Sequence, residues 1–299
     1  MKKVIVICGP TAVGKTKLAI DVAKYFNFEI ISGDSVSVYK KLDIGSAKPT
    51  LDEMCGIKHY LIDIKDPWDK YSVYDFMHDA REIIDNSDDI KIISGGTGLY
   101  ISSCLNDYEF TSPKRDLEYE EKFKDYSNEE LFEYLKKIDK NISNINIHPN
   151  NRNRVLRAIE VTEKTRKEFS SFNNKAKKVY DYFIIYLSMP REILYERINL
   201  RVDKMFDEGL LKEVKDLYDN NIMPDAIGYK EFIPYFKGLI SLDDVKEEIK
   251  KNTRHLAKRQ ETWFRNQMDS HFYDMSLDYN LVLNNIIKDL KEFIWEYIL

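Results

Sequence analysis

The strongest constraint on this chain is one glycine-rich segment near its start, which reads Gly9-Pro10-Thr11-Ala12-Val13-Gly14-Lys15-Thr16. It follows an apolar run, Val4–Cys8, and precedes residues 17–23, which carry apolar side chains at helical spacing. The pattern G-x-x-x-x-G-K-[ST] between a strand and a helix is typical of a phosphate-binding P-loop. Its backbone amides and the helix N-terminus would cradle phosphate oxygens. Lys15 would neutralise the outer phosphate, and the Thr16 hydroxyl would bind Mg²⁺. A glycine-rich turn without a ligand is the alternative, and the flanking strand and helix disfavour it.

Strand and helix patterns alternate after the P-loop. The chain predicts strands over 28–32, 90–94 and 180–187, and a helix over 72–86. Such alternation predicts an α/β fold with a parallel sheet, whose ligands bind beyond the carboxyl ends of the strands. The P-loop, Asp34 and the Gly95–Gly98 loop would then share one edge of the sheet.

A highly charged stretch interrupts this pattern. Residues 113–178 lack strand patterns, and helices are expected over 116–125, 128–138 and 150–165. We therefore expect a P-loop kinase-like core formed by 1–112 and 179–299, with a mostly helical insertion subdomain over 113–178. Helices are also expected over 191–218, 242–265 and 281–298.

The composition limits the possible partners. The 299 residues carry a net charge of −5, so a nucleic-acid surface would have to be a local cluster of Lys and Arg. The three cysteines match no metal spacing, which favours a reducing, cytoplasmic setting. The apolar run after Lys2 and Lys3 is too short for a signal peptide, and no apolar stretch approaches membrane-spanning length.

Asp34 is the first candidate for chemistry beyond the P-loop. A carboxylate after the second strand could be a general base, a magnesium ligand or a substrate clamp, or it could simply form a turn with Ser35. The expected strands end in Ser94-Gly95 and Ser188-Met189, so the acid that holds magnesium in conventional P-loop ATPases is missing there. This favours a transferase that does not hydrolyse nucleotide, but small-molecule kinases also lack a strict version of that acid.

Two basic clusters could contact a nucleic acid. Arg154 and Arg157 share a helix face after Pro149. A second stripe contains Lys251, Arg254, Lys258 and Arg265. Each cluster is compatible with a solvated helix face or with phosphate contacts.

Six segments together resemble the tRNA dimethylallyltransferases, which modify N6 of the adenosine immediately 3′ of the anticodon. They are GPTAVGKT (Gly9–Thr16), SGDSVSVYKKLDIGSAKP (Ser32–Pro49), ISGGTGLY (Ile93–Tyr100), RVDKMFDEGL (Arg201–Leu210), AIGYKE (Ala226–Glu231) and TRHLAKRQETWFR (Thr253–Arg265). The resemblance extends from about residue 3 to about residue 275. No Cys/His cluster follows it, so the chain resembles the short bacterial type.

The resemblance implies that Gly9–Thr16 bind the diphosphate of dimethylallyl diphosphate instead of ATP. Asp34 and Thr11 match the family's catalytic pair, with Asp34 accepting a proton from the adenine amine. Lys15, Arg201 and Mg²⁺ at Thr16 would stabilise the departing diphosphate. The target base would have to leave its stack to reach the pocket.

The resemblance also implies tRNA contacts in every part of the chain. They are Asp34, Ser35, Val36, Ser37, Thr97, Asn153, Arg154, Val155, Leu156, Arg157, Gly228, Tyr229, Lys230, Lys258, Arg259, Gln260, Trp263 and Arg265. Ser37, Asn151 and Asn153 depart from the residues usual in the family, which affects the expected hydrogen bonds to flanking nucleotides.

Three other functions stay open from sequence alone. They are a small-molecule kinase, an adenylate isopentenyltransferase that acts on free AMP, and a non-catalytic RNA-binding adaptor. The expected partners are the anticodon stem-loop of tRNA and dimethylallyl diphosphate, with no membrane, and the chain is expected to be a monomer.

Overall fold

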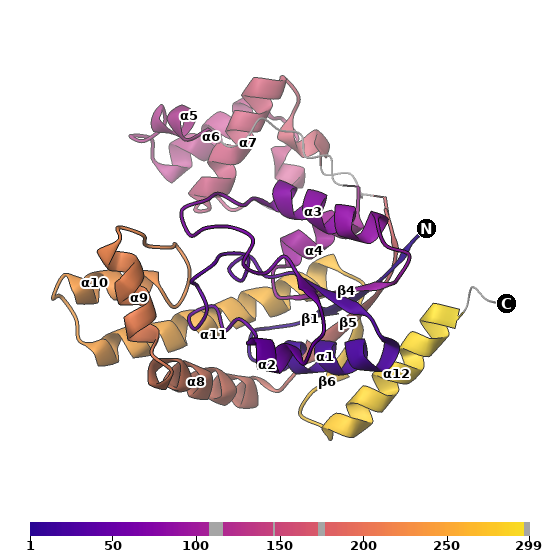
Figure 1. Cartoon of the computed structure of the whole chain (residues 1–299). Coiled ribbons are helices and arrows are strands. Elements are labelled where there is room, and N and C mark those ends of the chain that lie inside the picture. Colours follow the sequence, from indigo (N-terminus) through magenta and orange to yellow (C-terminus); the bar gives the residue numbers. More distant parts are fainter. Residues whose placement is uncertain (108–115, 146, 173–176, 296–299) are drawn as a thin grey trace. The chain divides into compact units, whose positions relative to one another are not determined.

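The computed structural model describes residues 1–107, 116–145, 147–172 and 177–295 (Figure 1). The chain forms two compact units. Met1–Asn106 and Lys178–Leu299 form the larger, which we call the core unit, and Asp107–Lys177 form the smaller, the insertion unit. The insertion predicted over 113–178 overlaps the smaller unit. Among the described residues, no helix has both the length and the apolar character needed to cross a membrane.

The core unit contains a six-stranded parallel sheet with the order β3-β2-β4-β1-β5-β6. Its strands are β1 (Lys3–Cys8), β2 (Glu29–Ser32), β3 (His59–Tyr60), β4 (Lys91–Gly95), β5 (Asp181–Ser188) and β6 (His271–Asp274). The predicted parallel sheet is therefore confirmed. No apolar pattern in the sequence indicates β3 or β6, because these edge strands are short and β6 begins with two exposed residues.

Helices cover both faces of the sheet, which explains why β1 is an unbroken apolar run. Ile5 and Ile7 pack on one face with α1 (Lys15–Phe26), α8 (Arg191–Asp207) and α12 (Tyr279–Trp295). Val4, Val6 and Cys8 pack on the other face with α3 (Val73–Asp85) and α4 (Gly98–Leu105). Figure 1 shows α3 and α4 above the sheet and α1 and α12 below it.

The helix α11 (Leu242–Gln267) packs against both layers. Ala257 belongs to the cluster below the sheet and Phe264 to the cluster above it. These two residues lie seven positions apart, on one side of the helix. The C-terminal half of α11 therefore runs along the sheet edge, where it can contact the loops that follow the strands.

A satellite core lies beside the sheet in the same unit. It contains Leu42, Tyr229 and Val245, together with α9 (Leu210–Asp219) and α10 (Ile233–Phe236). The single helix expected over 191–218 is wrong. The chain stops α8 at Asp207, and Gly209 adopts φ 102° before α9 begins. Another short helix, α2, spans Leu51–Met54.

The insertion unit is helical and has its own core. Its helices are α5 (Leu117–Glu121), α6 (Asn128–Ile138) and α7 (Arg152–Thr165). A 3₁₀ turn at Ile142–Asn144 lies between α6 and α7, and another at Phe169–Phe172 follows α7. Leu131, Leu135, Val155 and Ile159 are fully buried in one cluster. The helix expected over 150–165 begins later, because the Asn151 side chain accepts a hydrogen bond from Arg154 N and caps α7. The helix expected over 116–125 is shorter at both ends. That expected over 281–298 starts at Tyr279, and residues 296–298 lie outside the described part.

The packing of α1 against the sheet predicts a large cost for truncating Leu18, which is fully buried. Leu18→Ala is expected to lower the free energy of unfolding by about 2–5 kcal/mol, because the cavity removes contacts below the P-loop. Leu239→Ala is the matched control, since Leu239 is 71% exposed, and it should change stability by less than about 0.5 kcal/mol. Urea unfolding measures both, and equal effects would contradict the placement of α1.

Candidate active site

The P-loop joins the carboxyl end of β1 to the start of α1. Gly14 adopts φ 110°, a backbone conformation that residues with a side chain rarely adopt, and α1 begins at Lys15. The Lys15 ammonium turns back into the loop and donates to the carbonyl oxygens of Gly9 at 3.1 Å and Pro10 at 2.8 Å. The ammonium is thus held by two backbone carbonyls at the start of the loop, where a phosphate-binding P-loop has its lysine.

Burial and the neighbouring Arg201 lower the pKa of Lys15 to about 8, while the charge of Asp34 partly opposes the shift. Burial is also the main cause that lowers the pKa of Arg201, and the charge of Asp34 again opposes the shift. The two cations and one carboxylate therefore interact electrostatically across the site. An anion with two or more charges would relieve the repulsion between the cations.

Asp34 follows β2 and is held in a fixed turn. Its Oδ1 accepts hydrogen bonds from the amides of Val36 at 2.8 Å and Ser37 at 3.2 Å. Its other oxygen, Oδ2, receives no hydrogen bond from the described residues. Asp34 thus forms a turn, which was the structural alternative to a chemical role. The turn uses only Oδ1, so Oδ2 is available to accept a proton.

Thr11 and Arg201 are in contact, and both line the same cavity as Asp34. Arg201 donates from Nη1 to Thr11 Oγ1 at 3.3 Å and from Nη2 to the carbonyl oxygen of Ala47, also at 3.3 Å. Arg201 belongs to α8, which lies far from the P-loop in sequence. Arg197, one turn earlier on the same helix, lines the same cavity. That i, i+4 spacing was a signal for Arg197 that the sequence reasoning missed.

These side chains surround one cavity of about 860 Å³ in the core unit. Its lining includes Thr11, Ala12, Gly14, Lys15, Thr16, Asp34, Ser37, Ala47, Arg197 and Arg201. The structure therefore brings together the four residues predicted to be catalytic, from the P-loop after β1, the segment after β2 and α8. Gly9, Pro10 and Val13 complete the loop without lining the cavity, and Val13 is fully buried.

Predicted RNA contacts of the core unit divide into outer and inner residues. Lys258, Arg259 and Arg265 are exposed on α11. Gln260 instead turns inward, accepting from the Thr11 amide at 2.9 Å and donating to the Gly96 carbonyl at 3.0 Å. The Trp263 indole lies against Gly98, where an added Cβ would come within 2.1 Å of the ring. Gln260, which the resemblance assigns to the RNA contacts, thus has its carboxamide engaged at the sheet edge.

Thr97 and the loop after β2 lie together. The Ser35 amide donates to Thr97 Oγ1 at 3.2 Å. Ser35 and Val36 are half-buried, whereas Ser37 is buried but lines the cavity. Asp34 and Ser37 both line the cavity.

Tyr229, one of the predicted RNA contacts, is fully buried in this structure. Its hydroxyl donates to Glu213 Oε1 at 2.8 Å, and the same carboxylate accepts from the amides of Asp43, Ile44 and Gly45. Gly228 is buried, while Lys230 is exposed and pairs with Asp225 at 2.9 Å. Glu213 anchors the loop that borders the cavity, and no local sequence pattern distinguishes it from other helix-surface acids.

The predicted contacts of the insertion unit also differ in their exposure. Asn153 and Arg154 are exposed on α7, but Val155 and Leu156 are buried in the unit's core. Arg157 is held by the fully buried Glu160, with 2.6 Å between Nη1 and Oε2. Helical periodicity explains this division, because a run of five helical residues must place some of them inward.

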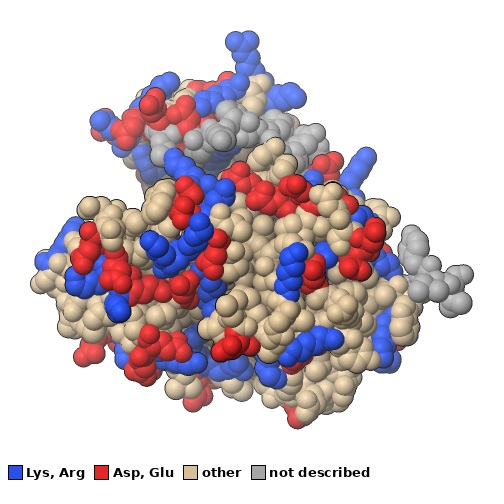
Figure 2. Space-filling view, in the orientation of Figure 1, with Lys and Arg blue, Asp and Glu red and all other residues tan. Residues whose placement is uncertain are grey.

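Basic and acidic side chains are interspersed on the face drawn in Figure 2. This agrees with the net charge of −5 and means that an RNA surface must be a local feature. Lys258 and Arg265 also line a second cavity of about 440 Å³, with Glu261 between them. Arg265 pairs with Glu261 at 2.9 Å, so its charge is partly compensated.

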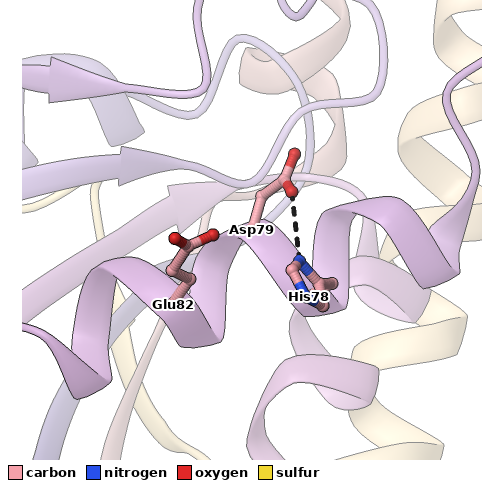
Figure 3. Close-up of side chains that lie close together, drawn as sticks. All are labelled: His78, Asp79 and Glu82. Atoms are coloured by element: carbon pink, nitrogen blue, oxygen red, sulfur yellow. Dashed lines mark ion pairs between the residues drawn. The ribbon is translucent and has the colours of Figure 1, made fainter.

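Thr16 is exposed at the start of α1 and lines the main cavity, so its hydroxyl could bind a metal that also binds a diphosphate. This single neutral donor fits Mg²⁺, which often keeps several waters and uses substrate phosphates as ligands. A different group, His78, Asp79 and Glu82 on α3, has ligand atoms within 4.8 Å of one another (Figure 3). His78 and Glu82 are exposed, and Asp79 already pairs with His78 and accepts from the Tyr71 hydroxyl. We assign no metal to that group.

Comparisons with known proteins agree on one family. A family described as "IPP transferase" matches residues 37–267, and a second, "Isopentenyl transferase", matches residues 2–67. A tRNA dimethylallyltransferase of Bacillus cytotoxicus is 47% identical over 287 residues, covering 92% of this chain and 91% of that protein. One from Bacillus licheniformis is 46% identical over 308 residues, covering 99% and 96%.

Solved structures give the same result. A tRNA isopentenylpyrophosphate transferase of Staphylococcus epidermidis is 42% identical and superposes with a TM-score of 0.73, covering 98% of this chain and 99% of that one. A eukaryotic dimethylallyltransferase acting on tRNA is 32% identical with a TM-score of 0.85, covering 99% and 80%.

The pKa of Lys15 predicts how pyrophosphate binding depends on pH. In the ligand-free protein Lys15 loses its proton as the pH rises through about 8, so its attraction for the anion is lost. Above that pH the affinity contributed by Lys15 should fall by up to about tenfold per pH unit. Isothermal titration of pyrophosphate between pH 7 and 9 measures the change. Lys15→Arg, which stays charged, is the control for the anion's own titration. A parallel pH profile in both proteins would contradict the shifted pKa.

Proposed function

Because the chain belongs to the IPP transferase family, we propose that it transfers a dimethylallyl group from dimethylallyl diphosphate to N6 of the adenosine immediately 3′ of the anticodon of tRNA. The enzyme is a prenyltransferase, and diphosphate is its leaving group. One observation carries the proposal at the level of residues: Thr11, Lys15, Asp34 and Arg201 line a single cavity at the carboxyl edge of the sheet.

The P-loop binds the diphosphate of the donor. Its amides, including those at the N-terminus of α1, donate hydrogen bonds to the anion. Lys15 gives up its hydrogen bonds to the carbonyls of Gly9 and Pro10 and binds phosphate oxygens instead. Arg201 approaches from α8 and contacts the same group. As the bond between the allylic carbon and the diphosphate oxygen breaks, its electron pair moves to the oxygen, and the two cations stabilise the growing negative charge.

Asp34 receives the proton that the reaction releases. The lone pair of the adenine N6 forms the new bond to the allylic carbon, which leaves the nitrogen with a positive charge. The free Oδ2 of Asp34 then takes a proton from that nitrogen, while Oδ1 stays bound to the amides of Val36 and Ser37. Thr11 positions the reacting groups through its hydroxyl, which Arg201 holds.

Mg²⁺ is the metal we propose for this site, with Thr16 as its protein ligand. When bound, the ion would neutralise part of the charge on the leaving diphosphate. The end of β4 offers no acidic ligand for the ion, since the strand ends in Ser94 and Gly95.

The RNA substrate must present its adenine outside the base stack. The exposed cations Lys258, Arg259 and Arg265 of the core unit and the exposed Asn153 and Arg154 of the insertion unit are the side chains we propose for the anticodon arm. We propose that residues 113–178 act as an insertion subdomain in RNA binding. A cytoplasmic monomer is the form that we expect to act on tRNA.

A small-molecule kinase is the competing function, and it explains the P-loop alone. Incubation with labelled dimethylallyl diphosphate and, separately, with labelled ATP distinguishes the two. The proposal expects label in RNA only from the prenyl donor, and turnover of ATP without prenyl transfer would contradict it. AMP offered in place of tRNA should remain unmodified, and its modification would indicate an adenylate isopentenyltransferase.

Asp34→Asn tests the general base without disturbing its turn, because Asn Oδ1 can still accept from Val36 and Ser37. We expect kcat to fall by about 10²–10⁴-fold while donor and RNA affinities stay close to wild type. Asp274→Asn is the matched control, because Asp274 forms a similar turn with Ser276 at the end of β6 and does not line the cavity. Single-turnover transfer assays measure both, and full activity of Asp34→Asn would exclude this role.

Replacing Lys258 and Arg265 together by Ala tests the outer face of α11. The double variant should bind the anticodon stem-loop more weakly, and the slope of log K against log salt should become shallower by about 1.5–2, as for two lost phosphate contacts. Lys237→Ala with Lys288→Ala removes the same charge from exposed positions elsewhere and should keep the wild-type slope. An unchanged slope in the first variant would show that α11 does not contact RNA phosphates.

A further inference from the structure

Gln260 lies on the side of α11 that faces the sheet, at the boundary between its two hydrophobic layers. It is three residues from the buried Ala257 and four from the buried Phe264, so all three share one helix face. At about 100° per residue, Lys258 and Arg265 lie about 140–160° away around the helix. The polar side chain of Gln260 thus lies between the apolar side chains of Ala257 and Phe264. It points away from the proposed RNA face.

The carboxamide of Gln260 joins two loops of the active site. Its Oε1 accepts from the amide of Thr11 in the P-loop at 2.9 Å, and its Nε2 donates to the carbonyl of Gly96 after β4 at 3.0 Å. The two bonds need an acceptor and a donor on the same side chain, and the carboxamide supplies both. Glutamate could not donate to Gly96, and lysine could not accept from Thr11.

The backbone at Gly96 is shaped to fit this side chain. A Cβ built at Gly96 would come within 2.3 Å of Gln260 Nε2. The close approach brings the carboxamide within hydrogen-bonding distance of the backbone. Thr11 is in turn tied through its hydroxyl to Arg201, so Gln260, Thr11 and Arg201 form one chain of contacts from α11 to α8 across the start of the P-loop.

We propose that Gln260 is a positioning residue for the donor site, which fixes the start of the P-loop against the Gly96 loop, and that it is not an RNA contact. The inference rests on the proposed function. Without the carboxamide, the Thr11 amide and the Gly96 carbonyl both lose their partners. Thr11 is then free to move away from Arg201, and the diphosphate loses a preorganised cradle.

Gln260→Met tests this inference because it keeps the length and volume of the side chain and removes both hydrogen bonds. Calorimetry with inorganic pyrophosphate should give a dissociation constant raised about tenfold, the order expected when two buried partners are left unpaired. The affinity for an anticodon stem-loop should stay within about twofold of wild type, because the outer face of α11 is unchanged. Gln267→Met, at the exposed end of the same helix, is the matched control and should change neither.

Three outcomes would overturn the proposal. Weaker RNA binding with unchanged pyrophosphate affinity would make Gln260 an RNA contact. Unchanged affinity for both would mean that the two bonds do not position the loop. A common loss of both affinities together with a lowered melting temperature would mean that Gln260 only holds α11 in place.

Gln260→Glu keeps the proposal testable if the Met variant does not fold. It preserves shape and the bond from Thr11, removes the donor to Gly96 and adds a negative charge beside the cradle. Its pyrophosphate affinity should fall more than that of Gln260→Met, and wild-type affinity in the folded Glu variant would contradict the proposal. The binding assay needs no catalysis, so a wild-type protein that binds pyrophosphate but transfers no prenyl group would contradict the proposed function alone.

Discussion

The active site depends on a lysine ammonium held inside a loop of backbone groups. Burying a cation is costly unless it finds partners, and Lys15 has the carbonyls of Gly9 and Pro10 and the nearby charge of Asp34. Arg201 adds a second cation that lowers the pKa of the first. In the ligand-free site two cations therefore face one carboxylate, and the diphosphate that we propose as ligand would supply the missing negative charge. The same shortage explains how the site stabilises charge that develops on a leaving group.

The parallel sheet makes this arrangement possible. Because all six strands run in one direction, the P-loop after β1, Asp34 after β2 and the Gly96 loop after β4 emerge at one edge. Two helices from later in the chain then reach that edge, with Arg201 from α8 and Gln260 from α11. The apolar faces of the same helices pack on the sheet, so the hydrophobic core and the geometry of the site are stabilised together.

The sequence predicted the parts that depend on local pattern. The P-loop, the central strands and most helices have strong apolar periodicity, and Asp34 was placed by its position after a strand. Long-range contacts were not predictable in the same way. The bond from Gln260 to Thr11 spans 249 positions, and nothing near Glu213 indicates that it binds three amides of a distant loop. The resemblance to a family marked whole segments, such as 153–157, whereas the fold buries Val155 and Leu156 and exposes Asn153 and Arg154. The apolar periodicity also does not indicate the break at Gly209, because both flanking segments are amphipathic helices.

The most direct test of the central claim is nucleoside mass spectrometry, with positional mapping, of tRNA incubated with the purified protein and dimethylallyl diphosphate. The account predicts a single dimethylallyl group on N6 of the adenosine immediately 3′ of the anticodon, with one diphosphate released for each group transferred. Unmodified tRNA, or prenyl groups distributed over adenosines elsewhere in the molecule, would contradict it.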